Sequence, residues 1–175
     1  MAHIRYVVLM GVSGCGKSTL AKALAERLGW MFIEGDECHP PVNIQKMSAG
    51  QSLTDADRGP FLRNVALAIK NSETSGVVAS CSALKLKYRD TIRSMCHGVK
   101  FVLPVLAREE LFLRLQARSD HFMPASLVDS QLAALEMPES PEDAIVIDGA
   151  LPTGFQIEQI VELLDLGRDC QSDRG

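Results

Sequence analysis

Short apolar runs alternate along the chain with longer stretches in which apolar residues recur every three or four positions. The runs cover 4–10, 30–33, 76–81, 99–105 and 144–148. Their length and β-branched content predict strands of a parallel sheet buried on both faces. The periodic stretches predict amphipathic helices, and these cover 17–28, 54–71, 83–95, 108–118, 126–135 and 155–166. Alternating strands and helices predict an α/β fold with right-handed crossovers, in which ligands bind at the carboxyl ends of the strands.

Two segments depart from this alternation. Residues 37–57 contain Pro40, Pro41 and Gly50, which predict a short helix and a loop forming a substrate-binding insert over the edge of the sheet. Residues 114–135 form a helix, a break over 119–124 and a second helix, an arrangement that predicts a lid.

The 175 residues, of which 46% are hydrophobic, are enough for one substantial core, so we expect a single domain over 1–175. The net charge of -4 argues against nucleic acid as a partner. No apolar run reaches the ~18 residues that a membrane span needs. The five cysteines are odd in number and include no CxxC pair, which is typical of reduced thiols in a cytoplasmic protein.

The sequence GVSGCGKS, residues 11–18, fits the pattern G-x-x-x-x-G-K-[ST] of a phosphate-binding loop, between a strand and a helix. Its glycines allow a tight turn whose backbone N–H groups converge on phosphate oxygens at a helix N-terminus. We expect Lys17 to contact the outer phosphates and Ser18 to bind Mg²⁺ beside a nucleotide such as ATP. The expected nucleotide-binding residues of this loop are Gly11, Val12, Ser13, Gly14, Cys15, Gly16, Lys17, Ser18 and Thr19.

Asp36 follows the second predicted strand, which places it at the same rim of the sheet as the loop. Phosphoryl transfer to an alcohol needs a carboxylate near the attacking hydroxyl, and Asp36 is the candidate for it, as base or as hydrogen-bond acceptor. Its alternative role is that of a turn residue capping the next segment. The third strand ends in Ser80, Cys81 and Ser82 instead of the Asp that holds Mg²⁺ in many such proteins, which disfavours motors and large GTPases.

Arg114 and Arg118 lie four positions apart on one predicted helix face, directly before the break. A lid brings such arginines to the phosphates of ATP and excludes water. The alternative for Arg114 is a solvated charged face. His121 either bonds within the lid or to substrate, or is a structural histidine.

The remaining polar groups fit a small anionic acceptor rich in hydroxyls. Cationic side chains suit a carboxylate, and His39 could bond hydroxyls. Taken singly, each of these residues is better explained as an ordinary surface residue, and only together do they favour a small polar anion over a nucleobase. The cationic candidates are Arg58, Lys85 and Arg89.

With these residues the sequence resembles the gluconokinases, over about residues 6–165. The matching stretches are 11–19, EGD with HP and NIQKM over 34–47, LTDADR over 53–58, CSALK with YRD over 81–90, and RSDHFMP over 118–124. The resemblance implies a five-stranded parallel sheet of order 2-3-1-4-5 with a lid, and a homodimer. It also implies transfer of phosphate from ATP to the C6 hydroxyl of D-gluconate. Asp36 would then face that hydroxyl, Arg58, Lys85 and Arg89 would hold gluconate, and Arg118 would come from the lid.

Two other functions stay open. A shikimate-type or other small sugar-acid kinase shares the loop, an acid after the second strand and a lid, although its usual second aspartate is absent here. A regulator that binds ATP without transferring phosphate would be expected to lack the acid or the lid arginine, and Asp36 and Arg118 are both present.

Overall fold

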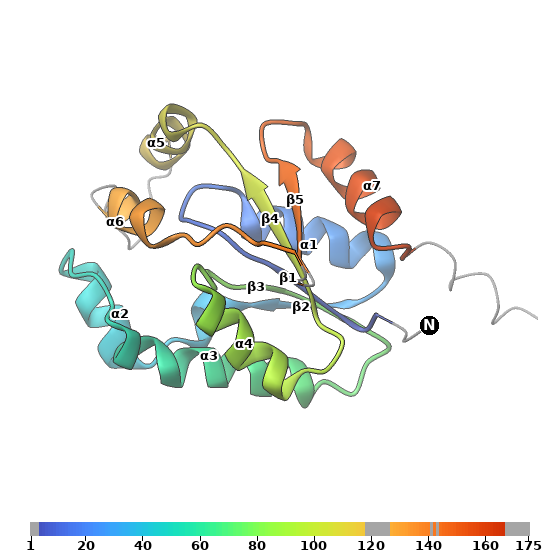
Figure 1. Cartoon of the computed structure of the whole chain (residues 1–175), viewed down its shortest axis with the longest axis horizontal. Helices are drawn as coiled ribbons and strands as arrows, with labels where there is room; N and C mark the ends of the chain where they lie inside the picture. Colours follow the sequence, from blue (N-terminus) through green and yellow to red (C-terminus); the bar gives the residue numbers. More distant parts are fainter. Residues whose placement is uncertain (1–3, 118–126, 141, 143, 167–175) are drawn as a thin grey trace, which may run out of the picture.

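The computed structural model describes residues 4–117, 127–140, 142 and 144–166. Five parallel strands form one sheet of order β2-β3-β1-β4-β5, as the resemblance implied (Figure 1). The strands are β1 (Tyr6–Leu9), β2 (Met31–Glu34), β3 (Val77–Ser80), β4 (Lys100–Val105) and β5 (Ala144–Asp148). Four of the strands lie within the apolar runs that predicted them, and β2 extends one residue beyond its run.

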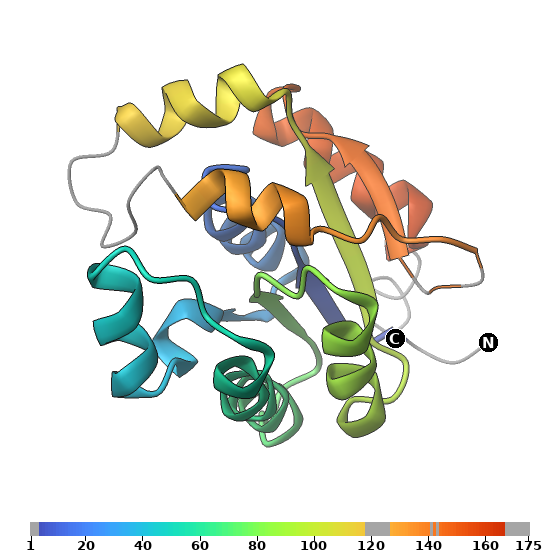
Figure 2. The ribbon, with the colours of Figure 1, turned by 60° about the vertical axis from the view of Figure 1, so that its left-hand side comes forward.

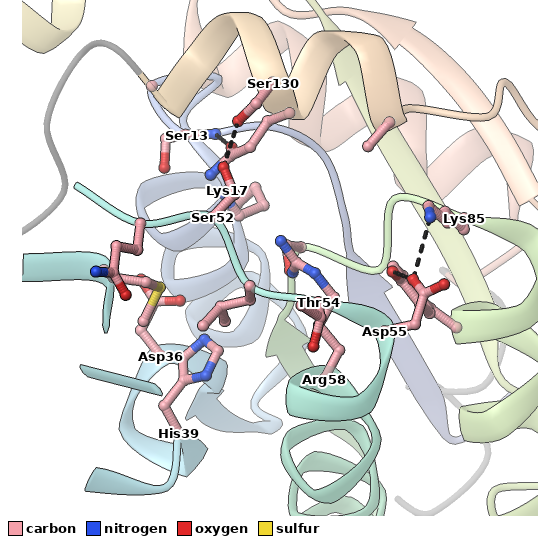
Figure 3. A pocket seen from close by; sticks show the side chains of 18 of the residues that line it. Ser13, Lys17, Asp36, His39, Ser52, Thr54, Asp55, Arg58, Lys85 and Ser130 are labelled. Atoms are coloured by element: carbon pink, nitrogen blue, oxygen red, sulfur yellow. Dashed lines mark hydrogen bonds and ion pairs between the residues drawn. The ribbon is translucent and has the colours of Figure 1, made fainter. Parts of the chain in front are cut away.

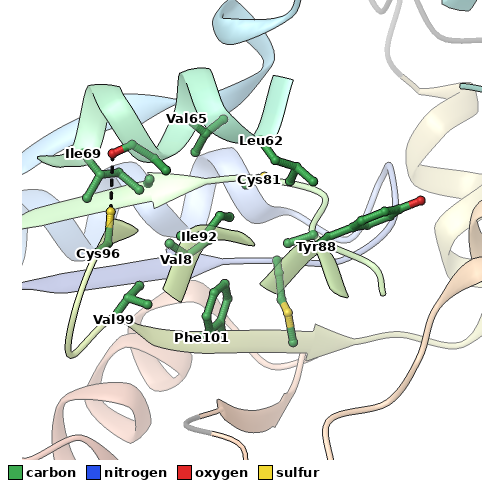
Figure 4. Close-up of a cluster of buried hydrophobic side chains, with 14 of the residues drawn as sticks. Val8, Leu62, Val65, Ile69, Cys81, Tyr88, Ile92, Cys96, Val99 and Phe101 are labelled. Atoms are coloured by element: carbon green, nitrogen blue, oxygen red, sulfur yellow. Dashed lines mark hydrogen bonds between the residues drawn. The ribbon is translucent and has the colours of Figure 1, made fainter. Parts of the chain in front are cut away.

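Helices cover both faces of the sheet (Figure 1). On one face, α1 (Lys17–Leu28) and α7 (Thr153–Leu163) pack against alternate residues of β1, Val7 and Leu9. On the other face, α3 (Asp55–Lys70) and α4 (Leu86–Met95) pack against Val8. Figure 4 shows this second cluster, in which side chains of α3 and α4 surround Val8 and Phe101. Because β1 is buried on both sides, its run of apolar residues is unbroken.

The remaining elements gather around the carboxyl ends of the strands. They are a 3-10 helix (Gly35–Cys38), α2 (Pro41–Ser48), α5 (Arg108–Gln116) and α6 (Leu127–Ala134). In Figure 2, α6 lies between α5 and α2. A third apolar cluster joins Leu111 and Leu115 of α5 to Val128 of α6 and to Val12 of the phosphate-binding loop. The short helix predicted inside residues 37–57 is therefore confirmed, and the described part of 114–135 packs against the loop.

Two helix starts show how local chemistry sets the boundaries. Thr54 caps α3: its hydroxyl accepts from Asp57 N at 3.2 Å, and Asp57 Oδ2 accepts from Thr54 N at 2.9 Å, a complete capping box. The helix expected from Ala83 begins only at Leu86. Ala83 has a φ of 34°, outside the helical region, so residues before Leu86 form a loop that leads Lys85 along the rim of the sheet.

In the part of the chain that the structure describes, none of the helices combines the length and the apolar character that crossing a membrane requires.

Candidate active site

The phosphate-binding loop joins β1 to α1 and takes the backbone shape that its glycines predict. Gly14 and Gly16 have φ angles of +85° and +91°, a region that side-chain-bearing residues rarely adopt. Gly16 is also the N-cap of α1, so no capping side chain covers the first N–H groups of the helix. A Cβ on Gly14 would stand 3.0 Å from Leu115 Cγ, because α5 packs closely against the loop. This end of α1 thus has the geometry and the dipole of an anion site.

Two predicted loop residues, Gly11 and Val12, form the base of the loop and line neither of the two cavities described below. Gly11 N donates to Ser82 O at 3.2 Å, which ties the loop to the end of β3. Val12 is buried, and its carbonyl accepts from Lys17 Nζ at 3.1 Å. The bond holds the Lys17 ammonium over the loop, where the charge of a bound phosphate would meet it.

Asp36 reaches the same rim through a tight junction between β2 and β3. A Cβ on Gly35 would lie 1.9 Å from Ser80 O, so only glycine fits between the two strands. Gly35 N donates to Ser80 Oγ at 3.1 Å, and the Ser80 hydroxyl in turn donates to the Glu34 carboxylate. That carboxylate also accepts from Asp36 N at 3.4 Å. Many related proteins have an aspartate at the end of the third strand. Here Ser80 stands at that end, and its hydrogen bonds stabilise the turn that contains Asp36.

A cavity of about 310 Å³ brings these elements together (Figure 3). Figure 3 shows Asp36 and His39 at one side of it, Lys85 at the other, and Arg58 between them. Most of the predicted phosphate and acceptor residues in the described chain therefore converge on one space. Those that line it are Ser13, Gly14, Gly16, Lys17, Ser18, Asp36, His39, Arg58 and Lys85.

The two cavity cations that were predicted to hold the acceptor, Arg58 and Lys85, differ in their partners. Lys85 Nζ lies 3.1 Å from Asp55 Oδ1, and Asp55 also accepts from Lys87 and from the Tyr88 hydroxyl. These donors hold the pKa of Asp55 far below its ordinary value. Arg58 Nη1 donates to Ser82 Oγ at 3.3 Å, and no carboxylate within the described ranges pairs with it. Among the described residues, Arg58 is therefore the cation of this wall whose charge no carboxylate balances.

His39 is a neutral group at the opposite wall. The residue is 8% exposed, its ring stacks on Phe61 with centroids 3.6 Å apart, and its Nδ1 lies 3.4 Å from Asn43 Nδ2. Burial lowers the pKa of His39 to about 4, Asp36 opposes the shift, and Arg58 adds to it. At neutral pH the imidazole therefore acts through hydrogen bonds and not through charge.

The expectation that Arg89 holds substrate needs correction. The Arg89 side chain is fully buried on the inner face of α4 and outside the cavity. Its Nε and Nη2 donate to the two carboxylate oxygens of Glu142 at 2.7 and 2.9 Å. Its Nη1 donates to the carbonyls of Leu84 and Glu136, both at 3.1 Å. Arg89 follows Lys85 by one helical turn, but the helix begins after Lys85, so the two side chains do not share a face.

Arg114 lies beside a second cavity, of about 260 Å³, on the other side of the loop. Its Nη2 donates to Glu110 Oε1 at 2.7 Å and to Gly149 O at 3.3 Å. Cys15 and Thr19 also line this cavity, whereas Gly14 and Gly16 line both. The loop thus separates two spaces that meet at its glycines. Arg118 and His121, predicted for the lid, lie outside the described residues.

Several cavity residues were not predicted as site residues. They are Ser52, Thr54, Asp55, Ser82, Tyr88, Ser130 and Gln131. Thr54 and Asp55 begin a predicted helix and belong to the stretch 53–58 that resembles the gluconokinases, but of that stretch only Arg58 was a candidate site residue. Gln131 Oε1 accepts from Ser13 N at 2.7 Å, and Ser130 Oγ lies 3.2 Å from Ser52 Oγ. These bonds join α6 to both the loop and the insert, a contact between segments far apart in the chain that no local pattern marks.

A phosphate-binding loop between β1 and α1, an aspartate after β2 and a cavity that they share with Arg58 and Lys85 are the features of a P-loop phosphotransferase that acts on a small molecule. A family model described as an AAA domain matches residues 7–138.

Relatives at substantial identity are gluconokinases. The chain is 46% identical to gluconokinase of Gluconobacter oxydans, over 90% of this chain and 89% of that one. It is 43% identical to thermosensitive gluconokinase of Escherichia coli, over 79% and 75% of the two chains. A solved gluconokinase structure from Sinorhizobium meliloti has a TM-score of 0.80 and 40% identity, over 94% of this chain and 98% of that one. The chain belongs to the gluconokinase family.

The fold is shared more widely. A shikimate kinase structure from Bacteroides thetaiotaomicron, 20% identical, has a TM-score of 0.65 over 92% of this chain and 98% of that one.

Proposed function

We propose that the protein transfers the terminal phosphoryl group of ATP to the C6 hydroxyl of D-gluconate, giving ADP and 6-phosphogluconate. The observation that carries the proposal is the shared cavity, in which Lys17 and Ser18 of the loop face Asp36 and Arg58. A donor phosphate at the loop and a small anion at Arg58 would place an acceptor hydroxyl beside Asp36. Family membership supports gluconate as that anion.

Each side chain has a distinct task in this reaction. Asp36 accepts a hydrogen bond from the attacking hydroxyl and orients it toward the phosphorus, or takes its proton as the bond forms. The Lys17 ammonium stabilises negative charge on the transferred group. Arg58 binds the gluconate carboxylate, because a guanidinium forms paired bonds with a carboxylate and this one has no competing carboxylate in the described chain. Lys85 and neutral His39 bond acceptor oxygens.

Mg²⁺ fits this site through Ser18, which follows Lys17 at the start of α1 and lines the cavity. The described residues hold no group of three or more His, Cys, Asp or Glu placed to bind a metal, so phosphate oxygens and water would supply the other ligands. The ion would neutralise charge on the phosphates when bound.

The segments around the cavity have matching roles. Residues 37–57 are the acceptor-binding insert, and 114–135 are a lid over the nucleotide, with Arg114 and Arg118 serving the donor and His121 the lid or the acceptor. Gly14, Gly16 and Thr19 at the second cavity support placing the nucleoside half of ATP there. A homodimer and a cytoplasmic location complete the proposal, and light scattering of the purified protein measures the first.

The test is a coupled assay of ADP release with Mg²⁺ and ATP, run with D-gluconate, with shikimate and without acceptor. We expect ADP release to depend on gluconate and to be lost in Lys17→Ala. ADP release that depends on shikimate and not on gluconate would assign the protein to the shikimate-type kinases. ATP binding without ADP release, whichever sugar acid is supplied, would replace the enzyme with a nucleotide-dependent regulator.

A further inference from the structure

Gln156 is a buried polar residue on the wall of the second cavity. It lies on α7, in the first turn, and only 7% of its surface is exposed. Its Nε2 donates to Leu151 O at 2.6 Å and to Gly149 O at 3.2 Å. Both partners belong to the loop that connects β5 to α7.

These two bonds determine which way the amide group points. Carbonyl oxygens only accept, so the nitrogen of the Gln156 amide must face them, and its two hydrogens are both in use. The Oε1 atom is then turned away from the β5–α7 loop. No residue in the described ranges donates a hydrogen bond to it, and Gln156 lines the cavity together with Gly16, Thr19 and Arg114. The amide oxygen, which has no donor among the described residues, is therefore available to a ligand in this cavity.

The support behind this acceptor is rigid. Gly149 N donates to Val105 O at 2.8 Å, and a Cβ on Gly149 would stand 3.0 Å from the same oxygen, so the loop is pressed against β4. Gly149 O accepts from Arg114 as well as from Gln156. The guanidinium on α5 and the amide on α7 are thus held by one carbonyl, at two sides of one cavity. A ligand entering it meets preset positions instead of mobile side chains.

We propose that Gln156 is a specificity-determining residue for the phosphate donor, and that its Oε1 accepts a hydrogen bond from the exocyclic amino group of the nucleobase. Adenine carries a donor at its 6-position, whereas hypoxanthine and guanine carry a carbonyl oxygen there. Two acceptors facing each other cannot bond, and both would lose water on burial. The wall therefore selects adenine nucleotides. The inference rests on the proposed function only in taking a nucleotide as donor.

Direct binding tests this without relying on turnover. Calorimetry with Mg²⁺ measures the Kd of ADP, of IDP and of purine riboside 5′-diphosphate, which lacks a 6-substituent. We expect ADP to bind about 10-fold more tightly than IDP, with the unsubstituted purine between them, a difference of the size of one buried hydrogen bond. This comparison uses the unmodified protein, so it does not depend on how any variant folds.

The variant Gln156→Met keeps the length of the side chain and removes the acceptor. We expect it to weaken ADP binding about 3-fold, because one hydrogen bond is lost, and to tighten IDP binding about 3-fold, because the facing acceptor is gone, so that the preference disappears. Gln159→Met is the matched control, because Gln159 lies on the same helix outside the lining of both cavities, and it should keep the preference.

Equal affinity of the unmodified protein for ADP and IDP would overturn the proposed role of Gln156, and so would equal weakening of both ligands in Gln156→Met. Either result would leave the kinase assignment standing, because the protein would still bind a nucleotide. Failure to bind any of the three diphosphates would refute the nucleotide-dependent function together with this inference.

Discussion

Replacing Glu142 by Gln tests whether Arg89 is a structural residue. The change keeps the size of the side chain but removes the charge that balances a fully buried guanidinium, whose Nε and Nη2 donate to Glu142 at 2.7 and 2.9 Å. Breaking one partner of a buried ion pair costs about 3–5 kcal/mol. The carbonyls of Leu84 and Glu136 still accept from Arg89 in the variant, so we expect a loss near the lower end, about 3 kcal/mol.

Urea unfolding, followed through the fluorescence of the single tryptophan, Trp30, measures this loss. With a slope of about 2 kcal/mol per molar urea, the midpoint should fall by about 1.5 M at pH 7. The KM for gluconate, measured well below the new midpoint, should change little, because neither Arg89 nor Glu142 lines the cavity. A midpoint within about 0.3 M of the parent, together with a raised KM for gluconate, would refute the structural role.

The pH dependence of stability offers a second check on the same pair. The bonds from Arg89, together with those from Arg93 and the Glu139 backbone, lower the pKa of Glu142 from 4.5 to about 2, although burial opposes them. The unfolded chain therefore binds a proton at Glu142 at higher pH than the folded protein does. The stabilisation from Glu142 is complete above about pH 5 and is lost as the pH falls toward 2. The stability gap between the parent and Glu142→Gln should narrow over that interval.

Other substitutions probe the site itself. Asp36→Asn should lower kcat by about 10²–10⁴-fold while the Kd for ADP stays within about 2-fold, since the carboxylate acts on the acceptor hydroxyl; a collapse of nucleotide affinity would contradict this placement. Arg58→Ala should raise the KM for gluconate about 10–100-fold and leave the KM for ATP nearly unchanged, whereas Lys70→Ala, at the far end of the same helix, should change neither. Because the pKa of His39 is about 4, His39 stays neutral from pH 5.5 to 8. The pH profile of the KM for gluconate, measured from initial rates over this range, should therefore have the same shape in the parent and in His39→Gln. An inflection near pH 6.5 that only the parent shows would contradict this.

Local sequence patterns placed most of the helices and strands, apart from the start of α4, and they located the phosphate-binding loop. The loop at 11–18 is contiguous, so its glycines, Lys17 and Ser18 stand in a fixed relation as soon as a strand precedes them and a helix follows. The capping box at Thr54 involves residues three positions apart, and its local bonds place the helix start. The position of Asp36 also followed from the sequence, because parallel strands end at one edge of a sheet.

The tertiary structure decided which of the candidate cations line the cavity, namely Arg58 and Lys85 but not Arg89. Arg58, Lys85 and Arg89 are equivalent in a sequence, since each is a basic residue near the predicted rim. Packing separates them: Arg89 is buried against Glu142, Lys85 is paired with Asp55, and Arg58 faces the cavity without a carboxylate in the described chain. Gln131 and Gln156 likewise meet the loop and the second cavity across long chain separations. The role of a charged or amide side chain depends on the partners that it meets in the folded protein. Tertiary packing determines those partners, and a local sequence pattern does not contain that information.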